Sequence, residues 1–234
     1  APHDADLSLR VANWSLDPYI RMFVPEWSPY TRAVVSGSLD VFGELNWQRL
    51  GAKATIDRVD LGLLDYDVTN DAPIRIVLDR QVVGIDQLRL AGEGTALELS
   101  GAVDLANNDV SVGVVGDANL SILQGFLQDL RGAGAAAVEA EITGSMQRPV
   151  LTGQASIWNG RIRHFSLPHG LEAINGRLVF EPGGVRFDDL RAMMGSGPVV
   201  VGGRVGLDGF EIDELGITAV GEQMQLRFPD GFRS

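Results

Sequence analysis

Cysteine is absent from the sequence, and lysine and histidine are scarce. Without cysteine there is no disulfide framework, no thiolate nucleophile and no cysteine-ligated zinc. A phosphate-binding loop needs a lysine after a glycine-rich turn, but the only lysine is Lys53, which follows the short stretch LGA. The histidines are His3, His164 and His169, and no serine or carboxylate lies at a catalytic spacing from them. We therefore expect a protein that is not an enzyme and that has no catalytic residue, metal ion or cofactor.

Positive charge is also in short supply. The 234 residues include 19 Lys+Arg against 31 Asp+Glu, which gives a formal net charge of -12. This balance argues against nucleic acid as a partner, because phosphate neutralisation dominates such binding. It also argues against electrostatic docking on anionic lipid head groups. No apolar run approaches the roughly 18 residues of a membrane-spanning helix.

Glycine, in contrast, is abundant, with 29 residues, and 10 prolines add further turns. Between the turns apolar and polar residues alternate, for example along 97–105 and 109–114. A period of two over short segments is typical of half-buried strands with one apolar face. Turn sequences such as NDAP at 70–73 and EPGG at 181–184 favour an antiparallel meander of short strands. The sequence therefore predicts an all-β fold.

Two segments depart from this alternation. Asp17 and Pro18 form a typical helix start, which predicts a short helix over 16–24 that ends before Pro25. A second short helix is predicted over 120–131, because its apolar residues fall on one stripe and glycines follow it. That stripe consists of Leu120, Leu123, Phe126, Leu127 and Leu130.

These features occur twice in the same order. The sequence GAVDL at 101–105 matches GRVGL at 203–207, an offset of 102 residues (203 minus 101). Earlier in the chain, ANWS at 12–15 matches ANLS at 118–121, an offset of 106 (118 minus 12). We interpret the chain as a tandem repeat in which each unit has one short helix and about seven or eight strands. The two predicted units are residues 1–116 and 117–234.

Repeated strands with one apolar face bury that face by stacking along an axis. A single ladder of about fifteen strands at 4.8 Å spacing would be on the order of 70 Å long, and such a sheet must curl. We expect an elongated, curled antiparallel sheet, a β-groove or β-taco, with its apolar face inward. The alternative is a closed sandwich in which the same side chains pack a core. The predicted groove-lining residues are Leu97, Leu99, Val103, Leu105, Val199, Val201, Val205 and Leu207.

Two further motifs have structural interpretations. Residues 65–71 resemble the start of a calcium loop, but Asn70 and Ile76 stand where such a loop needs glycine and glutamate. We predict a solvated strand end there. Asn13 and Asn119 both lie in glycosylation sequons just ahead of a predicted helix, and we interpret both as helix caps.

Four sequence stretches, in order along the chain, resemble the TamB family of the AsmA-like group. Residues 118–123 (ANLSIL) resemble its helix entry, and 141–153 (EITGSMQRPVLTG) resemble its Gly-Thr-x-x-x-Pro-x-x-x-Gly signature, with Ser145 in place of threonine. Residues 195–203 (GSGPVVVGG) resemble its glycine-strand-glycine segment, and 226–232 (LRFPDGF) its Leu-Arg-Tyr-Pro-x-Gly-Leu. The likeness runs along nearly the whole chain.

The resemblance implies properties that composition does not. Proteins of this family are very long, are anchored in the inner membrane by an N-terminal helix and cross the periplasm of double-membraned bacteria. They form an extended curled β-sheet with an apolar groove, and are implicated in phospholipid transport and in outer-membrane protein assembly with an Omp85-type barrel. The chain begins at Ala1 and shows no such anchor. We expect it to be an internal or near-terminal segment of a longer protein.

Together these observations predict a non-enzymatic periplasmic segment whose groove binds phospholipid acyl chains and conducts lipids between two membranes, supporting outer-membrane biogenesis. A second hypothesis is a chaperone or scaffold for outer-membrane protein assembly and secretion, which receives unfolded strands at the sheet edge or in the groove. A solenoid enzyme acting on polysaccharide is a third, but it requires clustered acids on one exposed face, and the sequence places none that way.

Overall fold

A computed structural model shows an all-β chain. The structure describes residues 4–23, 29–44, 46–125, 127, 129–165, 169–195, 197–209 and 211–221. The predicted all-β class is confirmed. The resemblance motif at 226–232 lies outside the described residues.

Fourteen strands and two short helical segments follow one another within the described residues. The first strands are β1 (Asp4–Ser15), β2 (Thr31–Glu44), β3 (Leu50–Leu63), β4 (Tyr66–Asn70), β5 (Ile74–Asp79), β6 (Val82–Gly92), β7 (Thr95–Asp104) and β8 (Asp109–Asn119). The remaining strands are β9 (Leu130–Ser145), β10 (Val150–His164), β11 (Leu171–Glu181), β12 (Gly184–Met194), β13 (Gly197–Asp208) and β14 (Glu211–Gly221). The helical segments are α1 (Asp17–Phe23) and η1 (Leu120–Gly125).

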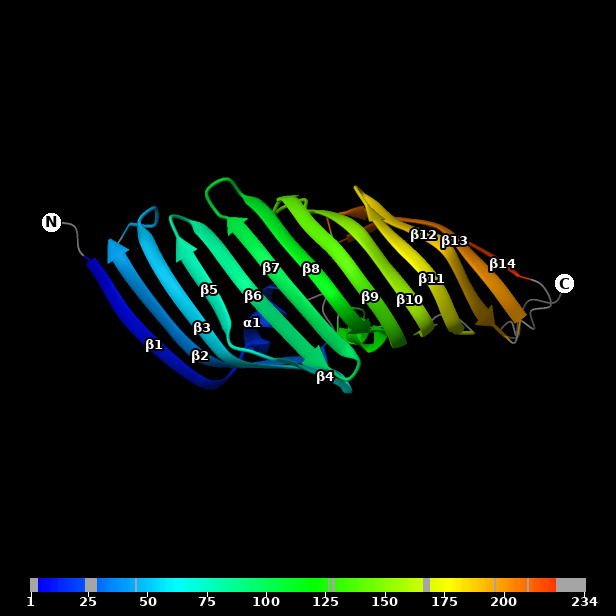
Figure 1. Cartoon of the computed structure of the whole chain (residues 1–234), viewed down its shortest axis with the longest axis horizontal. Helices are drawn as coiled ribbons and strands as arrows, with labels where there is room; N and C mark the ends of the chain where they lie inside the picture. Colours follow the sequence, from blue (N-terminus) through cyan, green and yellow to red (C-terminus); the bar gives the residue numbers. More distant parts are fainter. Residues whose placement is uncertain are drawn as a thin grey trace.

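All fourteen strands belong to one antiparallel sheet, in which nearly every strand pairs with its neighbours in sequence (Figure 1). The one exception is a fork, since β3 and β6 each pair with both β4 and β5. Short β-hairpin connections explain this meander, because antiparallel neighbours need only a few linking residues. The described strands therefore form one long sheet and not the two packed sheets of the sandwich alternative.

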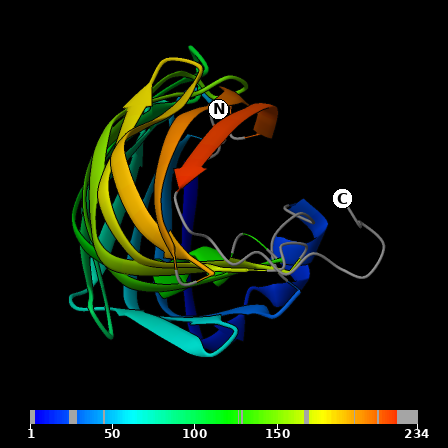
Figure 2. The same ribbon diagram turned by 90° about the vertical axis from the view of Figure 1, so that its right-hand side faces the viewer.

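The sheet curls around its long axis, so that it has a concave and a convex face (Figure 2). Extra residues interrupt the pairing in several strands. One lies at Asp57 in β3, others at 86–87 in β6 and 188–189 in β12. Such β-bulges bend a strand and increase its twist, which helps so many strands to curl.

The two helical segments differ from the predicted lengths. The first prediction, over 16–24, agrees with α1 at Asp17–Phe23, residue 24 being outside the described residues. The second, over 120–131, is wrong in extent, because η1 is a 3₁₀ turn of Leu120–Gly125 and Leu130 already belongs to β9. A tertiary contact explains the early stop. The Thr31 hydroxyl donates to the carbonyl of Gly125, the acceptor that a continuing α-helix would need for residue 129.

Burial is concentrated in one part of the concave face, in a cluster that includes Leu120 of η1. The covered cluster comprises Leu120, Ala136, Ile157, Ile174, Leu190, Ala192, Val199 and Val201. A smaller cluster of Leu63, Tyr66 and Val68 packs with Ile122 of the same turn. The predicted boundary between residues 116 and 117 falls inside β8, and the sheet continues through it without a break. The division into two units is thus an interpretation of the sequence pattern.

Candidate functional site on the concave face

Strand register determines which side chains share the concave face. Directly opposed residues of an antiparallel pair lie on the same face, and successive residues alternate between faces. Ala136 and Ile157 oppose each other and both pack in the cluster around Leu120 of η1. Because η1 lies on the inner side of the curl (Figure 2), these residues mark the concave face. The other concave positions follow by pairing from strand to strand.

Four continuous rows of apolar residues and glycines cross the concave face from strand to strand. The first row is Leu7, Val41, Ala52, Leu78, Val83, Val103, Val110 and Gly144, and the second is Leu9, Leu39, Ala54, Ile76, Ile85, Gly101, Val112, Ile142 and Leu151. The third is Leu88, Leu99, Val114, Ala140, Gly153, Phe180, Val185, Val205 and Leu215. The fourth is Leu90, Leu97, Gly116, Val138, Ala155, Leu178, Phe187, Gly203 and Ile217. None of these residues is polar or charged.

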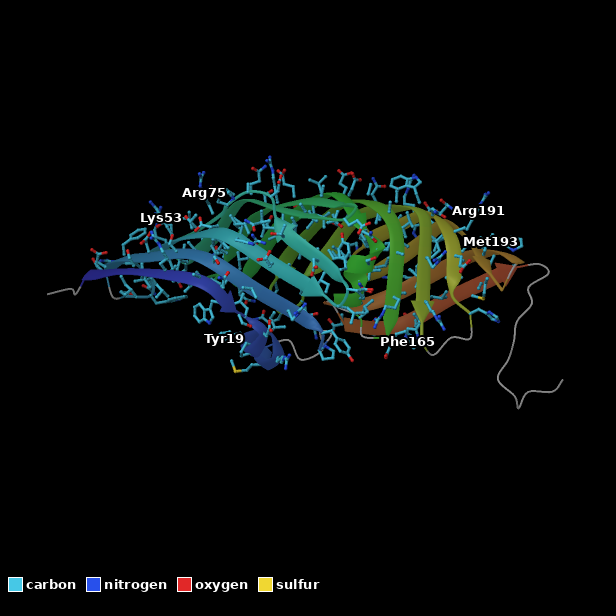
Figure 3. All side chains as sticks on the ribbon, turned by 90° about the horizontal axis from the view of Figure 1, so that it is seen from below. Tyr19, Lys53, Arg75, Phe165, Arg191 and Met193 are labelled. Carbon is cyan, nitrogen blue, oxygen red and sulfur yellow. The ribbon has the colours of Figure 1, made fainter. Side chains whose placement is uncertain are left out.

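The convex face has the opposite character. Lys53, Arg75 and Arg191 project from the outer side of the sheet (Figure 3). Ion pairs join neighbouring outer residues, among them Arg89 and Glu98, whose side chains are 3.3 Å apart. Such exposed pairs stabilise a fold by at most about 1 kcal/mol. They show that the alternation separates an apolar inner surface from a charged outer one.

Hydrogen bonds fix η1 over the lower part of the concave face. The Gln124 amide donates to the Asp65 carboxylate, and the Thr31 hydroxyl donates to the Gly125 carbonyl at 2.8 Å. Ser121 Oγ donates to the carbonyl of Gly132 at 3.1 Å. The turn thereby joins the ends of β2 and β3 to β9, and it covers only part of the apolar face.

Strand register places seven of the eight predicted groove-lining residues on the concave side, in two different environments, while Leu105 lies in the turn that follows β7. Val199 and Val201 are only 2% and 5% exposed, and they pack in the covered cluster. The other six are half-buried: Leu97, Leu99, Val103, Leu105, Val205 and Leu207. The contacts of Val199 and Val201 therefore fit the alternative interpretation, in which these side chains pack a core. That any of the eight lines a lipid groove stays a prediction.

A small apolar pocket lies on the concave side of β1, β2 and β3. It has a volume of about 190 Å³ and is lined mainly by Leu9, Val11, Trp14, Leu16, Val35, Leu39, Ala54 and Ile56. The predicted groove-lining residues lie in the later strands of each repeat and did not include this pocket on β1, β2 and β3. Its signal was the alternation of Leu7, Leu9 and Val11 in the sequence.

The few polar groups near the covered part of the concave face are satisfied by hydrogen bonds. The Tyr66 hydroxyl donates to the Glu93 carbonyl at 2.9 Å and also bonds the Thr95 hydroxyl, which accepts from the backbone N–H of Asn119. Burial raises the pKa of the Tyr66 phenol. Among the described residues, no buried side-chain nitrogen or oxygen lacks a partner. These groups stabilise the fold and leave no polar atom directed at a ligand.

The remaining motifs have structural roles. Asn70 of the calcium-like segment lies in β4, where its side chain accepts from the N–H of Val59 and donates to the carbonyls of Asp57 and Ala72. Asn119 caps η1 by accepting from the N–H of Ser121, as predicted. The same prediction is wrong for Asn13, which lies in β1 with φ 51° at a β-bulge, four residues before α1.

Neither a metal-binding cluster nor a membrane-spanning helix occurs in the described part of the chain. Its His, Asp and Glu residues form no group of three suited to holding a metal ion. Neither α1 nor η1, nor any other helix within that part, has the length and hydropathy to cross a bilayer. No family model, curated protein sequence or solved structure matches the chain.

Proposed function

We propose that the chain is a lipid-binding segment whose concave face forms an open groove for phospholipid acyl chains. The observation that carries the proposal is the set of four unbroken apolar rows without a charged or polar side chain. A groove of this kind binds an alkyl chain without specific contacts. The favourable free energy of binding is about 0.8 kcal/mol for each methylene transferred from water. Head groups remain outside, where the charged convex face and the turns meet water.

The proposed groove is built from two repeats. Supporting this, the bulge at 86–87 in β6 lies opposite the residue next to Gly101, and the bulge at 188–189 in β12 lies opposite the residue next to Gly203, at the same offset of 102 residues (203 minus 101). Both glycines have positive φ, 147° and 118°. Repetition of hairpins with a constant cross-section would lengthen the groove and preserve its apolar lining.

With the motif resemblance, the proposal extends to a place in the cell. We propose a periplasmic segment of a TamB/AsmA-like protein that conducts phospholipids between the inner and outer membranes and supports outer-membrane biogenesis. An inner-membrane anchor elsewhere in the parent protein and an Omp85-type barrel partner are implied by the resemblance alone.

The test is native mass spectrometry of the chain purified from a bacterial periplasm, with extraction of bound lipid. We expect phospholipid in roughly stoichiometric amount. The variants Leu99→Asp and Val112→Asp place a charge in the open rows and should lose that lipid, because burial of an unpaired carboxylate opposes acyl binding. Matched controls are Ser100→Asp and Ser111→Asp, the exposed neighbours on the convex face.

Lipid retained by both Leu99→Asp and Val112→Asp would refute the groove, as would equal loss in the two control variants. Val201→Asp is unsuitable for this test, because Val201 lies in the covered cluster and a charge there would disrupt folding.

A second candidate function, the protein-assembly scaffold, is favoured by the sheet edges. Among the described strands, β1 pairs only with β2 and β14 only with β13. Unpaired edges of this length accept further strands. Capture of an unfolded outer-membrane protein strand by crosslinking at Leu215 or Leu7, with no bound lipid in the mass spectrum, would favour this candidate over lipid conduction.

A further inference from the structure

Charge is distributed unevenly along the chain. Seven acidic residues and seven arginines lie between residues 129 and 200, so the net charge of that stretch is zero (7 minus 7). The formal charge of -12 therefore comes entirely from the rest of the chain. The total charge of the chain therefore does not exclude an anionic lipid surface as a partner of this stretch.

Several of these arginines share the outer face of the sheet on β9, β10 and β12. Arg163 lies directly opposite Arg131 on the neighbouring strand, with Arg161 two residues away on the same face of β10. Arg191 is on the outer side of β12 (Figure 3). Like charges placed opposite each other across two strands destabilise a sheet, so an anion that binds between them restores stability. We call Arg131, Arg161, Arg163, Arg191, Trp158 and Phe165 the outer arginine patch.

Few acidic groups neutralise the outer arginine patch. Arg161 approaches Glu172 at 3.7 Å, but both side chains are more than half exposed. Such a pair is weak and exchanges readily with another anion. Within the described part of the chain, neither Arg163 nor Arg191 has an ion-pair partner.

Exposed aromatic side chains accompany these arginines. Trp158 is 52% exposed on β10, and Phe165 is 57% exposed just after the strand ends. The guanidinium of Arg131 lies 5.0 Å from the centre of the Phe165 ring. Guanidinium groups bind phosphate through paired hydrogen bonds, and tryptophan is enriched at the level of lipid head groups. The combination fits a phospholipid surface better than it fits an acidic polypeptide, which offers carboxylates but no apolar layer for the rings.

We propose that the outer arginine patch docks the convex face of β9–β12 on the head-group surface of an anionic phospholipid bilayer. Phosphate groups contact Arg161, Arg163 and Arg191, and Trp158 inserts at the interface. The proposal goes beyond lipid binding in the concave groove and is independent of it, because it uses only outward-facing side chains.

Vesicle flotation tests the proposal directly. The chain should float with phosphatidylcholine vesicles that contain phosphatidylglycerol, and not with phosphatidylcholine alone. Substitution of Arg161, Arg163 and Arg191 by glutamine should lower the partition coefficient about five-fold per arginine, on the order of 100-fold for the triple variant. Trp158→Ala should weaken binding further. Bound wild-type protein should decrease as salt is added, a measurement that needs no variant.

The matched control is Arg10→Gln/Lys53→Gln/Arg75→Gln, which removes the same charge from the exposed outer face of β1, β3 and β5. It should float like the wild type. Equal flotation with neutral vesicles, no flotation at all, or an equal loss in the control would overturn the proposal. Retention on polyglutamate without flotation would overturn it in favour of an acidic polypeptide partner.

Discussion

The hairpins β6–β7 and β12–β13 have the same internal design and opposite surroundings. In each, the residue just before a two-residue bulge pairs with a glycine of positive φ, and the pair Leu88–Leu99 corresponds to Leu190–Val201. Leu190 and Val201 are each 5% exposed, whereas Leu88 and Leu99 are half-buried. Leu190 and Val201 belong to the buried cluster that also includes Leu120 of η1, whereas Leu88 and Leu99 belong to no such cluster of described residues. Alternation therefore determines the face of a residue, while tertiary packing determines whether that face is core or open surface.

The largest expected effect compares Leu190→Ala with Leu88→Ala. Leu190→Ala removes a buried side chain beside Leu120 and should lower the free energy of unfolding by about 2–5 kcal/mol. Leu88→Ala removes a half-buried side chain and should cost about 1 kcal/mol. Urea denaturation followed by circular dichroism measures both values. Equal losses would show that the two hairpins are equally covered in solution.

The attachment of η1 gives the next effect. Gln124→Ala removes the bond from the buried amide to Asp65 and should lower the free energy of unfolding by about 1.5–3 kcal/mol, the range for bonds to charged groups. Hydrogen exchange should also accelerate in Leu120–Gly125 and on β9, a strand that η1 contacts, but not on β6 and β7. Asn107→Ala, on an exposed turn, serves as control. Unchanged exchange on β9 would mean that the turn does not protect the strand it contacts.

The bulge glycines test whether the two hairpins are equivalent. An alanine Cβ at Gly101 would collide with the Ser111 carbonyl, and one at Gly203 with the Gly216 carbonyl. Gly101→Ala and Gly203→Ala should therefore each cost about 1–3 kcal/mol, as expected for strained positive-φ positions. Gly202→Ala has open space around the new Cβ and should be nearly neutral. Thermal denaturation compares the stability of the three variants. If only one of Gly101→Ala and Gly203→Ala is tolerated, the two hairpins are not equivalent.

The smallest effect concerns the turn after β7, where Asp104 corresponds to Gly206 in the other hairpin. The backbone N–H of Asn107 bonds the Asp104 carboxylate and lowers its pKa, with help from the Asn107 side chain and the Ala106 N–H. A lowered pKa means that the charged carboxylate favours the folded state. This contribution is present above the unfolded pKa of about 3.9 and is lost as pH falls through the lower folded value.

Asp104→Gly should therefore reduce thermal stability slightly at neutral pH and not at strongly acidic pH. Melting curves of variant and wild type across that range provide the measurement. A stability difference that persists in acid would point to a conformational effect of glycine and not to the carboxylate.

Much of the sheet was predictable from the local alternation of apolar and polar residues. The packing of η1 and of the covered cluster on the concave face was not. Alternation along 97–105 and turn sequences such as that at 181–184 gave the all-β class and the inward face of Leu99 and Val201. Gly125 at the end of η1 accepts a hydrogen bond from Thr31, which is 94 residues away. No local signal contains such a contact. The same reason explains why Val201 was grouped with Leu99, although only Val201 belongs to the covered cluster.

The bulges have a consequence for how such a sheet can grow. A strand bends at each β-bulge. Because the extra residue returns the apolar side chains to the concave face beyond the bend, the same face of the strand stays apolar on both sides of the bulge. Pairing is almost entirely between sequence neighbours. The number of hairpins thus sets the length of the sheet, while the bends within each strand set its curvature. Duplication or deletion of a hairpin would change the length of the sheet and leave its curvature the same.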